Sequence, residues 1–355
     1  MITEIMVTLI VLHHIFINTI SLEELNKNNY LKLINWNYIV LKIISNYGQF
    51  GNNVFIMISG FFSITKTSFN WNKFLSILFE IYTYYYPSIV LGKKLSAVYK
   101  KVKFPDYSSS KIYFPNLTQN GNWFAQIYLC LLIFIPYINM GLLNLNKEKY
   151  RQLIILIIIF YCIFKSILDF LKINSIIFST TSFINLLLPY IIGGYIRIYD
   201  SKYKVLWKII AICYFIFTIF SEIFFDILSY NFKNFRFVLF NSYLSFKINS
   251  LISIIGSIGM IYFFKSINLN NKKINWISAS VFGIYLVHGN KHITPYMYNI
   301  WFKFNLNDNY FLLKYIVKAF LIIIFSLSLD IIRRYTIGLI FNKIIKIIIR
   351  TINDY

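Results

Sequence analysis

Two adjacent histidines, His13 and His14, lie inside the first apolar stretch of the sequence, residues 2–20. An ionisable side chain in hydrocarbon costs free energy unless it faces a partner or a watery cavity, so a histidine there is a candidate functional group. Imidazole titrates near neutral pH, which suits it to take a proton from an attacking hydroxyl. The alternative is a neutral histidine that hydrogen-bonds a neighbouring helix.

The composition predicts an all-α polytopic membrane protein. Of 355 residues, 58% are hydrophobic and 20% aromatic, whereas 14% are charged, against about 25% in soluble proteins. At about 20 apolar residues per crossing, we expect a bundle of about ten transmembrane helices forming one domain over residues 1–355. The predicted spans are 2–20, 48–64, 74–92, 123–141, 152–168, 181–197, 205–226, 248–264, 276–290 and 311–332.

Residues 1–20 have neither a basic leader nor a small-residue cleavage site, so we expect a retained helix there and not a signal peptide. A basic amphipathic tail follows from residue 333.

The net charge of +22 comes from Lys and Arg between apolar runs, where they meet the lipid bilayer and set topology. We therefore expect no nucleic-acid partner. The loops on the side of both termini are shorter and more densely basic, which favours cytoplasmic termini. Cys130, Cys162 and Cys213 lie within apolar runs without metal-ligand or disulfide spacing.

Converting positions to depth at about 1.5 Å per residue places four polar stretches at one level near the outer leaflet. They contribute His14; Gly48, Gly51, Asn52 and Asn53; Asn122, Trp123, Gln126 and Tyr128; and His288 and Asn290. We expect a polar pocket there. The glycines can equally serve close helix packing, and Trp123 and Tyr128 can be interfacial aromatics. His288 and His292 have metal-pair spacing but no third ligand nearby, so no metal is expected.

At the cytoplasmic level, Lys66, Arg151 and Arg197 could hold the phosphates of a nucleotide-bearing donor, or they could be topology signals.

The acidic residues in or near the predicted spans require a cation, a hydrogen-bond donor or water as a partner. Glu80 requires a partner, a Lys or a Tyr hydroxyl, whereas Glu222 and Asp226 are expected to be solvated at a helix end. Asp330 is expected to pair with Arg333 and Arg334 at a helix end. The tyrosines at 82 and 84–86 look like an interfacial belt.

Several stretches resemble the integral-membrane acyltransferase 3 family. The similar segments, in the family's order, are 9–16, 48–62 (GQFGNNVFIMISGFF), 122–128 with 136–139, 189–199 with GGYIRIY, and 282–288 (FGIYLVH). The resemblance implies ten helices in the plasma membrane. It also implies transfer of an acyl group, usually acetyl, from acyl-CoA to a cell-envelope carbohydrate or lipid-linked sugar.

In that family the catalytic histidine follows an arginine by eleven residues on the first helix. His14 occupies the matching place, and His13 points about 100° away on a helix. The arginine position falls at Thr3. Either the true start lies upstream, or the electrostatic partner comes from elsewhere, or activity is reduced.

His14 is thus the candidate base for acyl transfer, with oxyanion donors drawn from Asn52, Asn53, Trp123 or His288. Alternatively, His14 carries the acyl group or helps it across the membrane. Other classes stay open: a transporter or flippase for a lipid-linked sugar, a polymerase, or a degenerate family member with a structural role. A transporter would more often show internal repeats, and the sequence has none that is evident.

Overall fold

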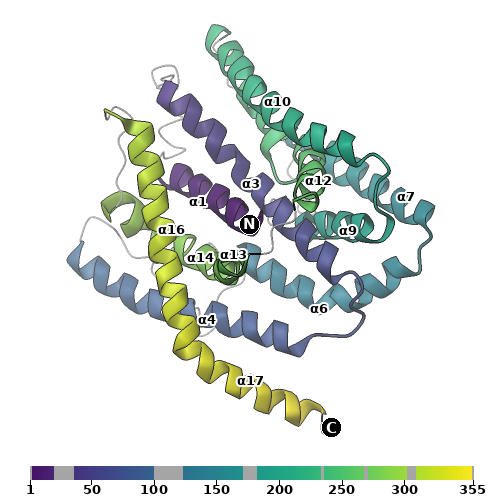
Figure 1. Cartoon of the computed structure of the whole chain (residues 1–355). Helices are drawn as coiled ribbons and strands as arrows, with labels where there is room; N and C mark the ends of the chain where they lie inside the picture. Colours follow the sequence, from purple (N-terminus) through teal and green to yellow (C-terminus); the bar gives the residue numbers. More distant parts are fainter. Residues whose placement is uncertain are drawn as a thin grey trace.

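The computed structural model describes residues 2–19, 36–99, 123–170, 182–232, 236–267, 271–301 and 309–353, and these residues form helices and their connections (Figure 1). The helices are α1 (Ile2–Thr19), α3 (Trp36–Ser63), α4 (Trp71–Val98), α6 (Trp123–Leu143), α7 (Lys147–Ile157), the π-helical η2 (Ile158–Phe164), α8 (Lys165–Phe170), α9 (Ile184–Tyr199), α10 (Lys204–Asn231), α11 (Arg236–Asn241), the π-helical η3 (Ser242–Phe246), α12 (Leu251–Lys265), α13 (Lys272–Ser278), α14 (Val281–His288), α15 (Thr294–Tyr296), the π-helical η4 (Met297–Trp301), α16 (Phe311–Tyr335) and α17 (Ile337–Asn353).

The chain is an all-α polytopic membrane protein. Within the described residues, 6 helices are long and apolar enough to cross a membrane, by length and composition, and two shorter apolar helices accompany them. Each predicted span overlaps a helix of the structure. The prediction was wrong in detail for 276–290, which is broken between α13 and α14. It also began the second span too late, because α3 already starts at Trp36.

Helix α3 is the centre of the bundle, in contact with α1, α9 and α12 (Figure 1). Its crossing with α9 depends on two glycines. A Cβ atom at Gly60 would run into the carbonyl oxygen of Tyr190, and one at Gly193 would run into that of Met57. Small residues allow such backbone contact between membrane helices, where packing replaces the hydrophobic effect as the driving force.

We expect Gly60→Ala and Gly193→Ala each to destabilise the protein by about 1–3 kcal/mol, because overpacking must push α3 and α9 apart. Gly141→Ala is the matched control, since a Cβ atom there meets nothing within 4 Å and alanine favours the helix. The measurement is the thermal midpoint of each purified variant in one detergent. Midpoints for Gly60→Ala and Gly193→Ala equal to that of Gly141→Ala would contradict this account of the α3–α9 contact.

The earlier start of α3 brings Lys42 into the bundle, and this overturns the expectation that Glu222 and Asp226 are solvated. All three residues are buried, with 8%, 2% and 3% of their surface exposed. Lys42 Nζ pairs with Glu222 and lies 2.6 Å from Asp226 Oδ1. Asn241 Nδ2 donates to Glu222 Oε2 over 2.8 Å. The three side chains therefore form a buried ionic cluster between α3 and α10.

Candidate active site

His14 of α1 and His288 of α14 face each other inside the bundle. Their ring centroids are 4.9 Å apart, with the ring planes tilted by 42°. His288 is fully buried, and Tyr285 lies 6.3 Å from the ring of His14 and 6.0 Å from that of His288. Two segments separated by more than half of the chain thus bring two imidazoles and a phenol together.

The hydrogen bonds of His288 fix which of its ring nitrogens carries the proton. Nδ1 lies 2.5 Å from the carbonyl oxygen of Ile284, and a carbonyl can only accept, so Nδ1 is the donor. In the neutral ring Nε2 is then an acceptor, and among the described residues it has no hydrogen-bond partner. Tyr298 donates to the backbone oxygen of His288 over 3.1 Å. His288 is thereby held with a proton-accepting nitrogen inside the bundle.

His13 has a different environment from its neighbour. Its Nδ1 donates to the carbonyl oxygen of Ser45 over 2.8 Å, and its Cβ occupies the space left by Gly48 on α3. His13 therefore ties α1 to α3, and of the two adjacent histidines only His14 contacts His288 among the described residues.

Aromatic rings of α6 pack against Tyr285, the neighbour of the histidines. Phe124 lies 5.4 Å from Tyr285, and Trp123 packs edge-on against Phe124 at 5.9 Å. Trp123 is thus one ring removed from Tyr285, and no contact of the described residues joins it to either histidine. Tyr285 was not a predicted site residue. The signal was its position three residues before His288, which places both on one helix face.

The asparagines at this level separate into two groups. Asn53 Nδ2 donates both hydrogens, to Ile248 O over 2.8 Å and to Ser253 Oγ over 3.1 Å, so it is not available as an oxyanion donor and that prediction was wrong. Asn52 is 6% exposed, and its one hydrogen bond to a described residue is to Gln49, over 3.3 Å. Its Oδ1 has no partner among the described residues.

Asn290 and Asn122 of the predicted pocket, and His292 of the histidine pair with metal-like spacing, have structural contacts or lie outside the described residues. Asn290 Nδ2 donates to Ser88 Oγ over 3.0 Å, and His292 packs on the ring of Tyr85 at 5.7 Å. Asn122 lies outside the described residues. In the part of the chain that the structure describes, no three His, Cys, Asp or Glu side chains are grouped as metal ligands would be.

The three predicted phosphate-binding cations lie at the end of the bundle where α3 and α9 end and α7 begins. Arg197 stacks on Phe61 of α3 at 5.1 Å, Lys66 follows α3, and Arg151 lies close enough to Tyr195 of α9 to interact electrostatically. None of the three has a carboxylate partner among the described residues. The cavity that Lys66 lines is small and is shared with Lys73, and neither arginine reaches it.

Two other cations at this end share one carboxylate. Asp200, between α9 and α10, accepts from Lys204 at 2.8 Å and Lys265 at 3.0 Å. Partial burial would raise the pKa of this carboxyl, but the two ammonium groups outweigh that effect and lower it to about 2. Asp200 therefore stays ionised across the physiological range and keeps both of its lysine partners.

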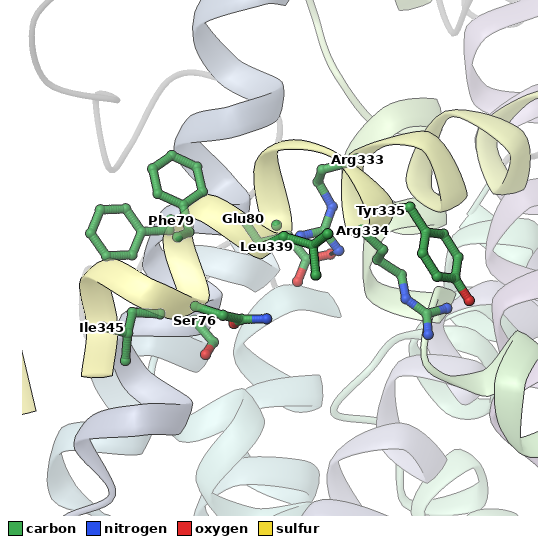
Figure 2. Close-up of a pocket in the computed structure, with 11 residues that line it drawn as sticks. Ser76, Phe79, Glu80, Arg333, Arg334, Tyr335, Leu339 and Ile345 are labelled. Atoms are coloured by element: carbon green, nitrogen blue, oxygen red, sulfur yellow. Dashed lines mark hydrogen bonds and ion pairs between the residues drawn. The ribbon is translucent and has the colours of Figure 1, made fainter. Parts of the chain in front are cut away.

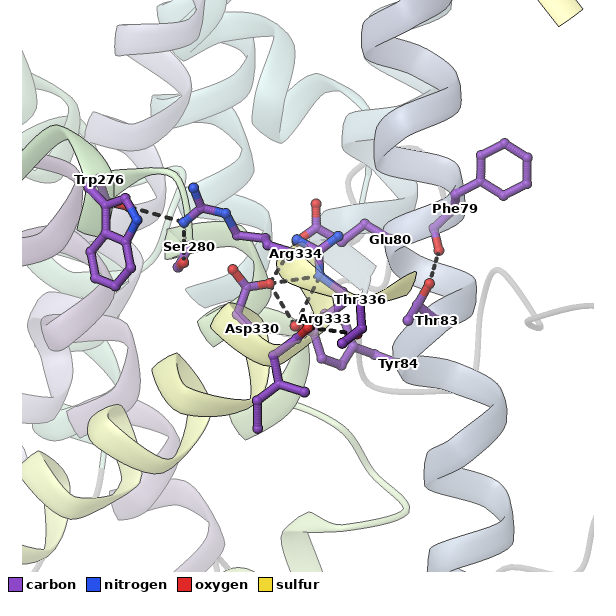
Figure 3. Close-up of polar contacts among 11 residues, drawn as sticks. Phe79, Glu80, Thr83, Tyr84, Trp276, Ser280, Asp330, Arg333, Arg334 and Thr336 are labelled. Atoms are coloured by element: carbon purple, nitrogen blue, oxygen red, sulfur yellow. Dashed lines mark hydrogen bonds and ion pairs between the residues drawn. The ribbon is translucent and has the colours of Figure 1, made fainter. Parts of the chain in front are cut away.

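A second polar network joins α4 to the end of α16 (Figure 3). Arg333 Nη2 donates to Glu80 Oε1 over 2.9 Å, and its Nε donates to Asp330 Oδ1 over 2.8 Å. Tyr84 donates to the same Asp330 oxygen over 2.6 Å. The Asp330–Arg333 pair confirms the Arg333 part of the prediction. The partner of Glu80 is an arginine, not the predicted Lys or Tyr hydroxyl, and Tyr84 belongs to this network and not only to an interfacial belt.

Arg334 does not join that pair. It bonds Trp276 O over 3.1 Å and Ser280 Oγ over 3.0 Å. Ser278, two residues earlier, bonds Glu4, the neighbour of Thr3. Arg334 of α16 and Glu4 of α1 therefore both bond the short segment formed by α13 and the turn after it. Glu4 is next to Thr3, the position at which the family pattern has an arginine.

The sequence profile of the acyltransferase 3 family, described as an acyltransferase domain, matches residues 5–331, nearly the whole chain. The chain belongs to the acyltransferase 3 family. It is therefore a membrane O-acyltransferase, which favours this class over the transporter, flippase and polymerase alternatives. Comparison with curated proteins and with solved structures found no match.

Proposed function

We propose that this acyltransferase moves an acyl group, acetyl in the simplest case, from acyl-CoA to a hydroxyl of a cell-envelope polysaccharide or lipid-linked sugar. The observation that carries the proposal is the pairing of His14 with His288 inside the bundle, beside Tyr285. Two imidazoles held in contact, one with a proton-accepting nitrogen, provide the base that ester formation from an alcohol requires.

In the proposed reaction, His14 takes the proton of the acceptor hydroxyl as its oxygen attacks the thioester carbonyl. Collapse of the tetrahedral intermediate breaks the carbon–sulfur bond, and the proton passes from His14 to the departing thiolate. Ester and free thiol are the products, so His14 returns to its starting state. Nε2 of His288, which has no hydrogen-bond partner among the described residues, orients the hydroxyl or shares its proton with His14.

Oxyanion stabilisation requires donors with hydrogens to spare. Asn52 has one amide hydrogen beyond its bond to Gln49, and we assign it this role. Trp123 contacts Phe124, which separates it from Tyr285. We assign its indole N–H to a hydrogen bond with an acceptor sugar that enters along α6.

We assign the donor phosphates to Lys66, Arg151 and Arg197, because these cations have no acidic partner among the described residues and share one end of the bundle. This end would face the cytoplasm, where acyl-CoA is made, in a plasma-membrane protein with cytoplasmic termini. No metal takes part in this scheme.

Mass spectrometry of envelope glycans from cells with and without the chain tests the proposal. We expect an added acyl mass on one glycan class only when the intact chain is present, and its loss with His14→Ala at equal membrane abundance. The result also identifies the acceptor. A change in glycan length or amount without a change in acylation would contradict the proposal, and so would an unchanged glycan profile.

A further inference from the structure

A cavity of about 350 Å³ lies between α4, α16 and the start of α17, away from the histidine pair (Figure 2). One side is polar, with Glu80, Arg333 and Arg334. Phe79 and Ile345 lie on the other side, and Leu339 lies between the two (Figure 2). Phe79 stacks on Phe341 of α17 at 4.6 Å with the planes 11° apart, which holds α17 against α4.

The two guanidinium groups that line the cavity differ in their partners. Arg333 pairs with Glu80 and with the buried Asp330, whereas Arg334 has no carboxylate partner among the described residues. Arg334 lies over the ring of Trp276 at 5.8 Å, and its hydrogen bonds to described residues use only Nη1, so its Nε and Nη2 hydrogens have no acceptor among those residues. Arginine donors of this kind suit the planar recognition of phosphate oxygens.

Helix α17 has the surface of a helix that lies in a membrane interface. Ile345 faces the protein with 3% exposure, whereas Ile340 and Ile347 are 59% and 64% exposed. On a helical projection of about 100° per residue, the exposed isoleucines form one stripe. The basic residues form the next stripe around the helix: Lys343, Lys346 and Arg350. No acidic residue occurs in α17.

We propose that this cavity binds the phosphate headgroup of an anionic glycerophospholipid, with one acyl chain along the apolar side and α17 lying in the headgroup layer. Apolar exposure next to a basic stripe is the pattern of interfacial helices, which anionic lipids attract. The unused Arg334 donors suit the phosphate headgroup of a lipid, and the apolar lining of the cavity suits one of its acyl chains. The bound lipid would connect α17 to α4 and α16.

The test uses the full chain, purified in a neutral detergent, with phosphatidylglycerol and phosphatidylcholine as probes. Native mass spectrometry counts the lipids retained, and titration gives the affinity of the tightest site. We expect phosphatidylglycerol to stay bound during native mass spectrometry and to have the higher affinity, and phosphatidylcholine to be lost. Equal affinity for the two lipids would overturn the proposal.

Two variants locate the site. Arg334→Gln removes the available donors, and Ser76→Phe fills the cavity from α4 without changing charge. Each is expected to weaken phosphatidylglycerol binding by at least about tenfold, a loss of about 1.4 kcal/mol. Lys149→Gln, which removes an exposed charge from α7, is the matched control and should bind as the unmodified protein does. Unchanged binding by Ser76→Phe would overturn the location even if Arg334→Gln fails to fold.

Competition shows whether the cavity binds a lipid phosphate or the phosphate of a soluble ligand. Inorganic phosphate and CoA are added to the lipid-loaded protein at increasing concentration. We expect neither to displace the lipid, because neither can occupy the apolar wall. Displacement by CoA would overturn the lipid assignment and show that the cavity takes a nucleotide-bearing donor. No arm of the test depends on acyl transfer.

Discussion

His14→Ala is expected to reduce acyl transfer by at least about 10²-fold, the lower end of what a positioned general base contributes. His13→Ala is expected to retain most of the activity per folded molecule, because the side chain of His13 bonds the Ser45 carbonyl and lies over Gly48. The pair is a matched comparison, since the two substitutions remove the same group from adjacent residues of one helix.

Rates are measured as acyl groups transferred per minute and per mole of protein purified in the same detergent, with the folded fraction determined by size-exclusion chromatography. His14→Gln adds a separate test, because glutamine can hydrogen-bond but cannot take a proton at neutral pH. We expect it to be as inactive as His14→Ala. Equal losses from His13→Ala and His14→Ala in folded protein would remove the assignment of a single base.

The sequence allowed the level of the histidine pair to be predicted, but not every neighbour. Depth along a helix follows from residue number at about 1.5 Å per residue, and this placed His14 and His288 together. Depth does not say which neighbour a helix face meets. Asn53 is at the predicted level but faces α12, where both of its amide hydrogens are used.

The limits of α3 could not be predicted from hydropathy. Lys42, Ser45 and Asn46 read as a loop because each is polar, so the span was started at residue 48. Their partners are distant in sequence: Lys42 pairs with residues on α10, and Asn46 Nδ2 donates to Glu222 over 3.2 Å. A cluster of polar residues at the end of a membrane helix cannot be told from a loop by hydropathy until its buried partners are known.

The Arg333 network shows the same limit for side chains at helix ends. The Asp330–Arg333 pair is local, three residues apart, and followed from the sequence. Glu80 and Tyr84 come from α4, about 250 residues earlier, and only the packing of α16 against α4 brings them together. Local spacing therefore predicted one contact of this network, and tertiary structure supplied the rest.

Lys42→Ala is expected to destabilise the protein by about 3–5 kcal/mol, because it leaves Glu222 and Asp226 buried without their cation. Both carboxylates are at most 3% exposed, so water cannot replace the ammonium group without opening the contact between α3 and α10. The measurement is the thermal midpoint in one detergent, with Lys149→Ala as the control at an exposed position, where a change within about 0.5 kcal/mol is expected.

The triple variant Lys42→Met, Glu222→Gln, Asp226→Asn separates the cost of an unpaired charge from the loss of the side chain. Replacing a whole buried ion pair by neutral groups of similar size is often tolerated, so we expect the triple variant to recover most of the stability lost in Lys42→Ala. Transfer per folded molecule should be unchanged in all of these variants, because the cluster does not contact His14 or His288 among the described residues. A triple variant no more stable than Lys42→Ala would show that the stability of the bundle depends on the charges themselves. A thermal midpoint of Lys42→Ala equal to that of the control would show that the ionic cluster contributes nothing to stability.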